Sequence, residues 1–215
     1  FLTPHVRTDA LGLRGPPLPP RAGTDEVRLL FLGDSGTFGM RVEEHERFSD
    51  RLVEALGADG PGLRFTAVNA GVVGHAASQL LARLPGLLDA TRPDALVLSS
   101  GLNDCQLRPA TDAQLLALAT STGERFRAGL RRSQVACAVE AGWAWLRREA
   151  HRQSTGARLP VAAWLHYPRY PAGAPSVPRT PEPEFLAKLE RIEELCRERG
   201  VELVLLTQYT SAAVP

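Results

Sequence analysis

The stretch Val27-Arg28-Leu29-Leu30-Phe31-Leu32-Gly33-Asp34-Ser35, residues 27–35, decides the fold. Its first six residues are mostly apolar and a glycine ends the run, which is typical of a short buried strand. Similar runs recur at Phe65–Val68, Ala95–Leu98, Val161–Leu165 and Val201–Leu206. The sequence therefore predicts five strands, each buried on both faces.

Apolar residues between these runs repeat at helical spacing. They predict a helix over 48–56 capped by Gly57, a helix over 80–88 kinked at Pro85, two helices over 112–153, and a last helix over 185–195. Strands that alternate with helices form a parallel sheet. We expect an α/β fold: a doubly wound, flavodoxin-like, five-stranded parallel sheet with helices on both faces and a helical insertion between strands three and four.

Length, charge and cysteine content narrow the class of protein to which the chain can belong. The 215 residues predict one domain over 27–215, after an extended proline-rich arm over 1–26. A net charge of +1 gives no electrostatic reason to expect a nucleic-acid partner, and no apolar run approaches the ~18 residues of a membrane span. The three cysteines form no CxxC pair, which argues against a zinc site. Neither these counts nor the cysteines decide the compartment.

Polar clusters follow the first three predicted strands. They are Gly33-Asp34-Ser35, Asn69-Ala70-Gly71-x-x-Gly74 and Gly101-x-Asn103-Asp104. Each alone also suits an ordinary helix cap or turn. Because the carboxyl ends of parallel strands meet at one edge of the sheet, the three clusters together predict a ligand site there.

These clusters resemble the first three sequence blocks of the SGNH, or GDSL, hydrolase family, with Thr37-Phe38-Gly39 continuing the first. The resemblance implies that Ser35 is the catalytic nucleophile. It also implies that Ser35 N–H, Gly71 N–H and the Asn103 side chain form the oxyanion hole. Such an arrangement suits ester chemistry, because an ester carbonyl attacked by serine becomes an oxyanion that needs several converging donors.

Other residues near these clusters are expected to line the pocket: Asp34, Thr37, His75, Asp104 and His166. We expect Asp34 and Asp104 to anchor their loops rather than to act as acids. Cys105 is expected to be a small buried apolar residue. The resemblance implies neither a metal nor an organic cofactor.

The chain departs from the family at its end. The family's catalytic histidine lies in an Asp-x-x-His block after the last strand, but Thr207–Pro215 contains neither Asp nor His. Since the chain also starts at Phe1, we expect a trimmed piece whose base lies beyond Pro215; an atypical or non-catalytic relative is the alternative. We further expect no histidine within about 3.2 Å of Ser35 Oγ, and an exposed apolar strip beside the fifth strand.

The expected function is that of a serine esterase or acylhydrolase acting on a small-molecule, glycan or lipid ester. Two alternatives stay open. An O-acyltransferase would use the same acyl-enzyme, and a glycan- or lipid-binding module would keep the pocket without turnover.

Overall fold

A computed structural model describes residues 6–40, 42–59, 62–108, 110–114 and 176–207. The chain divides into two compact units, residues 1–108 with 177–215, and residues 109–176. Almost all described residues belong to the first unit, and the fold and the site below are those of that unit.

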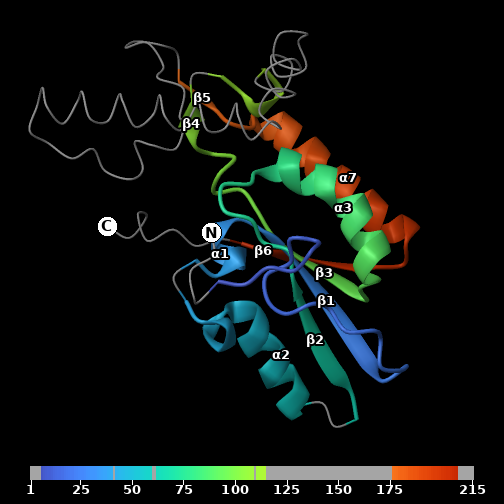
Figure 1. Cartoon of the computed structure of the whole chain (residues 1–215). Coiled ribbons are helices and arrows are strands. Elements are labelled where there is room, and N and C mark those ends of the chain that lie inside the picture. The colour runs from blue at the N-terminus through green and yellow to red at the C-terminus, as the bar shows by residue number, and fades with distance from the viewer. Residues whose placement is uncertain (1–5, 41, 60–61, 109, 115–175, 208–215) are drawn as a thin grey trace, which may run out of the picture. The chain divides into compact units, whose positions relative to one another are not determined.

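The first unit alternates strands and helices (Figure 1). Its elements are β1 (Glu26–Gly33), α1 (Ser35–Phe38), the 3-10 helix η1 (Glu44–Glu46), α2 (Phe48–Asp59), β2 (Arg64–Asn69), α3 (Ala77–Thr91), β3 (Ala95–Ser99), β4 (Leu107–Arg108), β5 (Val177–Pro178), α7 (Glu182–Glu198) and β6 (Glu202–Leu206).

The described central sheet has the strand order β2-β1-β3-β6, and every pairing is parallel. Gly33 pairs with Ser99, and Ser99 pairs with Leu206, so these strands end at one rim. The prediction of a parallel sheet is confirmed. The strand expected over 161–165, and all but residues 112–114 of the helices expected over 112–153, lie outside the described residues.

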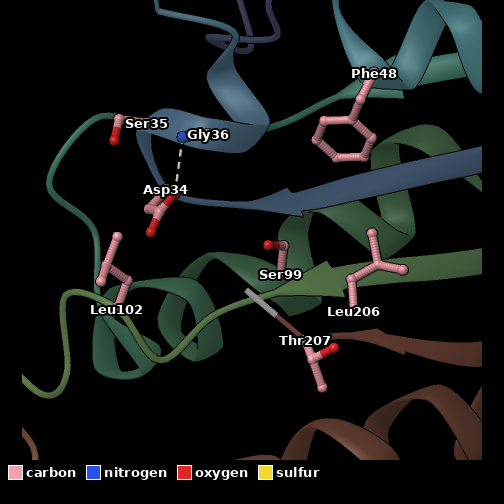
Figure 2. Close-up of a pocket in the computed structure, with 8 residues that line it drawn as sticks. All are labelled: Asp34, Ser35, Gly36, Phe48, Ser99, Leu102, Leu206 and Thr207. Atoms are coloured by element: carbon pink, nitrogen blue, oxygen red, sulfur yellow. Dashed lines mark hydrogen bonds between the residues drawn. The ribbon is translucent and has the colours of Figure 1, made fainter. Parts of the chain in front are cut away.

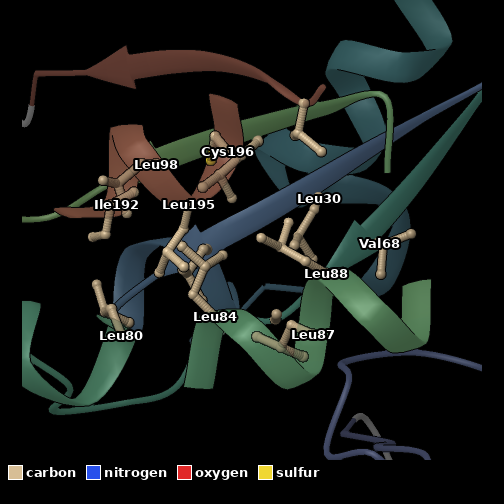
Figure 3. Close-up of a cluster of buried hydrophobic side chains, with 14 of the residues drawn as sticks. Leu30, Val68, Leu80, Leu84, Leu87, Leu88, Leu98, Ile192, Leu195 and Cys196 are labelled. Atoms are coloured by element: carbon tan, nitrogen blue, oxygen red, sulfur yellow. The ribbon is translucent and has the colours of Figure 1, made fainter. Parts of the chain in front are cut away.

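Two apolar clusters cover the two faces of this sheet. On one face, side chains of β1 and β3 pack against α3 and α7 (Figure 3). That cluster includes Leu30, Leu32, Leu96, Leu98, Leu80, Leu84, Leu88, Ile192 and Leu195. On the other face, Leu29, Phe31 and Val97 pack against Val53 and Leu56 of α2. The alternation along β1 follows the period of two that a strand imposes, and helices cover both faces as expected.

Several local expectations are corrected. Gly57 does not end the helix that contains it, because α2 continues to Asp59. Pro85 lies inside α3, as expected, and the kink expected at this residue stays a prediction. Cys105 is exposed rather than buried. In the N-terminal arm, Leu13 is buried in the cluster under α3, because a turn closed by the Thr8–Arg14 bridge brings it inward.

Within the described ranges, no helix is both long enough and apolar enough to cross a membrane. Within the same ranges, no group of three or more His, Cys, Asp and Glu side chains is arranged to hold a metal ion.

Candidate active site

Ser35 is the first residue of α1, directly after β1 ends at Gly33. Asp34 is the N-cap of α1, and its Oδ1 accepts a hydrogen bond from Gly36 N–H at 2.8 Å. Gly39 ends the helix in the left-handed conformation, with φ of 70°. The sequence folds this way because aspartate is a favoured N-cap and glycine a favoured C-terminal residue. Asp34 is 2% exposed. Because it caps α1, it anchors the loop between β1 and that helix.

A four-residue helix is not stable by itself, so neighbouring segments must hold α1 in place. Gly71 lies directly against its backbone: a Cβ there would be 2.7 Å from the Thr37 carbonyl carbon and closer still to Phe38 N. Gly33 is similarly close to the Thr37 hydroxyl, and a Cβ on it would also lie 2.5 Å from Ser99 O. These glycines are required because no larger residue allows the first two clusters to approach each other.

Asn69 connects the second cluster to α1. Its Nδ2 donates to Thr37 O at 2.6 Å and to Ser49 Oγ at 3.1 Å. Its Oδ1 accepts from Gly71 N–H at 3.1 Å. Asn69 is 3% exposed, and these bonds satisfy both ends of its buried amide.

The third cluster is anchored by Asp104. Its carboxylate accepts from Ala77 N–H, with distances of 3.0 and 3.2 Å to the two oxygens, and from Ser100 Oγ at 3.2 Å. Because Ala77 begins α3, Asp104 places negative charge at the positive end of that helix. Asp104 is 2% exposed, which fits the anchoring role expected from the sequence.

Asn103 is held beside it at both ends of its side chain. Nδ2 donates to His75 O at 2.7 Å, and Oδ1 accepts from Gln106 Nε2 at 2.8 Å. An amide nitrogen carries two protons, so Asn103 keeps one further N–H. Gly71 has a single N–H, which is directed at Asn69 Oδ1. That the three donors converge on one oxygen near Ser35 stays a prediction.

A pocket of about 410 Å³ opens at the carboxyl rim of the sheet (Figure 2). Its size falls within the range of small-molecule sites, about 300–1,000 Å³. The lining residues are Asp34, Ser35, Gly36, Phe48, Ser99, Leu102, Leu206 and Thr207. They come from the N-cap and first residues of α1, directly after β1, from the ends of β3 and β6 with the residue after β6, from the start of α2, and from the loop after β3.

The expected pocket residues do not all reach this pocket. Asp34 lines it, whereas Thr37, His75 and Asp104 are not among the residues that line it. Thr37 is buried, and its hydroxyl has no hydrogen-bond partner within the described part of the chain. His166 lies outside the described residues.

Three apolar lining residues were not anticipated from the sequence. Leu206 is the last residue of β6, so its position at the rim was available from the strand pattern. Leu102 is the variable residue of the Gly-x-Asn-Asp cluster. Phe48 starts α2, and no sequence signal connects it with the end of β1.

His75 lies near positive charge. Burial lowers its pKa most, and the charges of Arg83 and Arg179 lower it further. Arg179 donates to Gly74 O at 2.6 Å and so links the segment before α7 to the second cluster, a contact that no local pattern indicates. The pKa of His75 therefore lies below its usual range, which favours a neutral ring at pH 7.

The Ser35 hydroxyl has no hydrogen bond to another described residue, and of the described histidines neither His45 nor His75 contacts it in that way. That no histidine nitrogen lies within about 3.2 Å of Ser35 Oγ stays a prediction. His5, His151 and His166 lie outside the described ranges.

The sequence matches the model of the GDSL-like lipase/acylhydrolase family over residues 31–213. The chain therefore belongs to this family, the SGNH or GDSL hydrolases. No curated protein has a matching sequence.

Several solved structures of esterases are similar to parts of the chain. Acetylxylan esterase Axe2 of Geobacillus stearothermophilus is 31% identical over 37% of this chain and 40% of its own, with a TM-score of 0.31. The SGNH-hydrolase family esterase AlinE4 is 20% identical over 83% of this chain and 75% of its own, with a TM-score of 0.35. The two-domain esterase CEX, active on acetylated mannans, is 22% identical over 46% of this chain and 28% of its own, with a TM-score of 0.36. The matches thus span less than half the length of Axe2 and of CEX.

Proposed function

We propose that the protein is a serine hydrolase that cleaves a carboxylic ester through an acyl-enzyme on Ser35. The placement of Ser35 carries this proposal. Ser35 begins α1, lines the pocket and lies at the rim where the strands end and the three polar clusters follow them. Family membership supports the same chemistry. We propose no metal or organic cofactor for the reaction.

The reaction proceeds in two steps. Ser35 Oγ attacks the carbonyl carbon, its proton passes to a general base, and a tetrahedral oxyanion forms. The oxyanion collapses, the bond to the alcohol oxygen breaks, and the base returns the proton to the departing alcohol. Water then attacks the acyl-enzyme by the same route, which releases the acid and restores the Ser35 hydroxyl.

Three donors would hold the oxyanion. Ser35 is the first residue of α1, and the backbone N–H groups of a helix's first turn have no partner within the helix. Its own N–H is therefore the first donor. Asn103 contributes the N–H that His75 O does not take. Gly71 N–H is the third donor, and Asn69 Oδ1 must share or release it when the oxyanion forms. Loss of one such donor typically costs about 100- to 1,000-fold in rate.

A fluorophosphonate probe tests the nucleophile directly. We expect it to label the protein at Ser35, with the site read by mass spectrometry, and we expect Ser35→Ala to remain unlabelled. Ser100→Ala is the matched control, because Ser100 is a nearby serine whose hydroxyl donates to Asp104. Labelling that persists in Ser35→Ala contradicts the assignment.

Hydrolysis of small esters by the same proteins separates the remaining possibilities. Release of free acid supports the esterase. Labelled protein that transfers acyl groups to a sugar hydroxyl without releasing acid would indicate an acyltransferase, and protein that is never labelled would indicate a binding module. pH–rate profiles of His75→Ala and His166→Ala test whether either side chain takes the Ser35 proton.

A further inference from the structure

We propose that Arg179 is a positioning residue for the oxyanion hole: it holds both hydrogen-bond partners of the Asn103 side chain and so directs the second N–H of that amide. This inference rests on the proposed function, which makes Asn103 an oxyanion donor. Its evidence is a set of hydrogen bonds that joins the segment before α7 to the loop after β3 and to the segment before α3.

The orientation of the Asn103 amide is set by two partners. Nδ2 donates to His75 O at 2.7 Å, and Oδ1 accepts from Gln106 Nε2 at 2.8 Å. The amide group is planar and its nitrogen carries two protons, so these two bonds also fix the direction of the second N–H. That donor is therefore only as well placed as His75 and Gln106 are.

The side chain of Arg179 holds the first partner. Its Nη1 donates to Gly74 O at 2.6 Å, and its Nη2 donates to Gln79 Oε1 of α3 at 3.3 Å. Gly74 O directly precedes His75 O along the chain, and Gly74 has a φ of 81°. Glycine restrains its own backbone least, and the neighbouring Val73 is 48% exposed. A charge-assisted bond to Gly74 O therefore fixes the segment at the point where its own residues restrain it least.

The backbone of Arg179 holds the second partner. Its N–H donates to Gln106 O at 3.0 Å, and Gln106 N–H donates to Asn103 O at 3.3 Å. The pairing of β4 with β5 begins at the next residues, Leu107 and Pro178. Arg179 is 8% exposed, so the buried side chain also fixes the backbone that contacts Gln106. One residue thus fixes the segments on both sides of the Asn103 amide.

Arg83 offers a matched comparison within the same cluster. Its Nη1 donates to Ala70 O at 2.9 Å, so it is also an arginine bound to a main-chain carbonyl before α3. That bond involves neither His75 nor Gln106. Loss of either arginine should lower stability, because a carbonyl loses a charged donor, but only loss of Arg179 should misalign Asn103.

The test is a double-mutant cycle with p-nitrophenyl acetate as the substrate of the full chain. We expect Arg179→Met to lower kcat about 10- to 100-fold and to change KM by less than about threefold, because the donor acts on the oxyanion rather than on the bound ester. In an Asn103→Ala background the same substitution should cost less than about threefold, because the misaligned donor is already absent.

Two further variants complete the cycle. Arg83→Met is the control, and its effect on kcat should be the same with and without Asn103. Arg179→Lys keeps one donor for Gly74 O and is the milder variant for the same comparison. We expect it to lower kcat less than Arg179→Met does, and to have no further effect in the Asn103→Ala background.

Nuclear magnetic resonance provides a readout that does not depend on turnover. The side-chain amide signals of Asn103 are identified by their loss in Asn103→Ala protein. We expect Arg179→Met to shift both Nδ2 proton signals, because the bond to His75 O changes, and Arg83→Met to leave them in place.

These outcomes separate the two proposals. If no ester is hydrolysed but the Asn103 signals respond to Arg179→Met alone, the proposed function fails and the positioning role stands. An unchanged kcat in Arg179→Met, a loss of kcat that is equally large without Asn103, or Asn103 signals that respond alike to both substitutions overturns the inference.

Discussion

The guanidinium of Arg14 lies over the ring of Phe38, 5.3 Å from its centroid, and the Arg14 side chain is completely buried. Phe38 is the last residue of the helix that Ser35 begins. Arg14 N–H also donates to Asn69 O at 2.7 Å, and Arg47 Nη1 donates to Arg14 O at 2.9 Å. The N-terminal arm is therefore part of the support of the candidate site.

Replacing Arg14 tests this support. Arg14→Met removes the cation over Phe38 and the 3.3 Å ion pair with Glu44. We expect the free energy of unfolding to fall by about 1–3 kcal/mol. We also expect fluorophosphonate labelling of Ser35 to slow by at least roughly tenfold, because a small displacement of a reacting group is costly. Labelling rates and urea denaturation measure the two effects.

Arg7→Met is the control for that variant, because Arg7 also pairs with Glu44 but is 60% exposed at its side chain. We expect it to change both quantities little. An Arg14→Met protein that is labelled as fast as the unmodified protein would show that the arm does not position Ser35.

Gly71→Ala is expected to destabilise the protein strongly. The added Cβ would lie 2.7 Å from the Thr37 carbonyl carbon, and backbone cannot move aside as a flexible side chain can. We expect a loss of at least about 2 kcal/mol of unfolding free energy, and loss of Ser35 labelling even where the protein remains folded. Gly86→Ala is the matched control: nothing lies within 4 Å of its Cβ position inside α3. It should stabilise by about 0.5–1 kcal/mol.

Asp104→Ala removes the carboxylate that caps α3 and binds Ser100. Because Ala77 N–H would stay buried without its acceptor, we expect about 1–3 kcal/mol of destabilisation in thermal or urea unfolding. Asp89→Ala, whose side chain is 69% exposed beside Arg199, should change stability by no more than about 0.5 kcal/mol. Equal effects of the two substitutions would contradict the capping role.

Glu26 makes the free energy of unfolding depend on pH. Its hydrogen bond from Arg28, at 2.7 Å, is the main cause that lowers the Glu26 pKa to about 2. Because the pKa is lower in the folded state, its contribution is complete above the usual pKa near 4.5 and is lost as pH falls toward 2.

Glu26→Gln should therefore be less stable than the unmodified protein at pH 7, and the difference should shrink between about pH 4.5 and 2. Urea unfolding at pH 7, 4 and 3 measures it. Glu54→Gln, which removes an exposed partner of Arg51, is the control and should show a small, pH-independent difference. A constant difference for Glu26→Gln would mean that this carboxylate is not held ionised by the fold.

The sequence by itself determined the parallel sheet and the elements that bear the candidate nucleophile. Strand runs such as 27–32 are visible because burial on both faces needs mostly apolar residues, and a following Asp-Ser marks a helix start. Gly33 and Gly71 could be singled out because they stand where strands end. The helix ends were less accessible: α2 continues past Gly57 because, inside a packed helix, tertiary contacts outweigh the local cost of glycine.

Only the tertiary structure decided which distant residues complete the site. Arg14 reaches Phe38 from the arm, Arg179 reaches Gly74 across 105 positions, and Phe48 and Leu206 line the same pocket as Ser35. Local pattern encodes whether a residue is buried and which face of a strand or helix it occupies. It does not encode which buried faces meet, because that depends on the simultaneous packing of all the elements around the sheet.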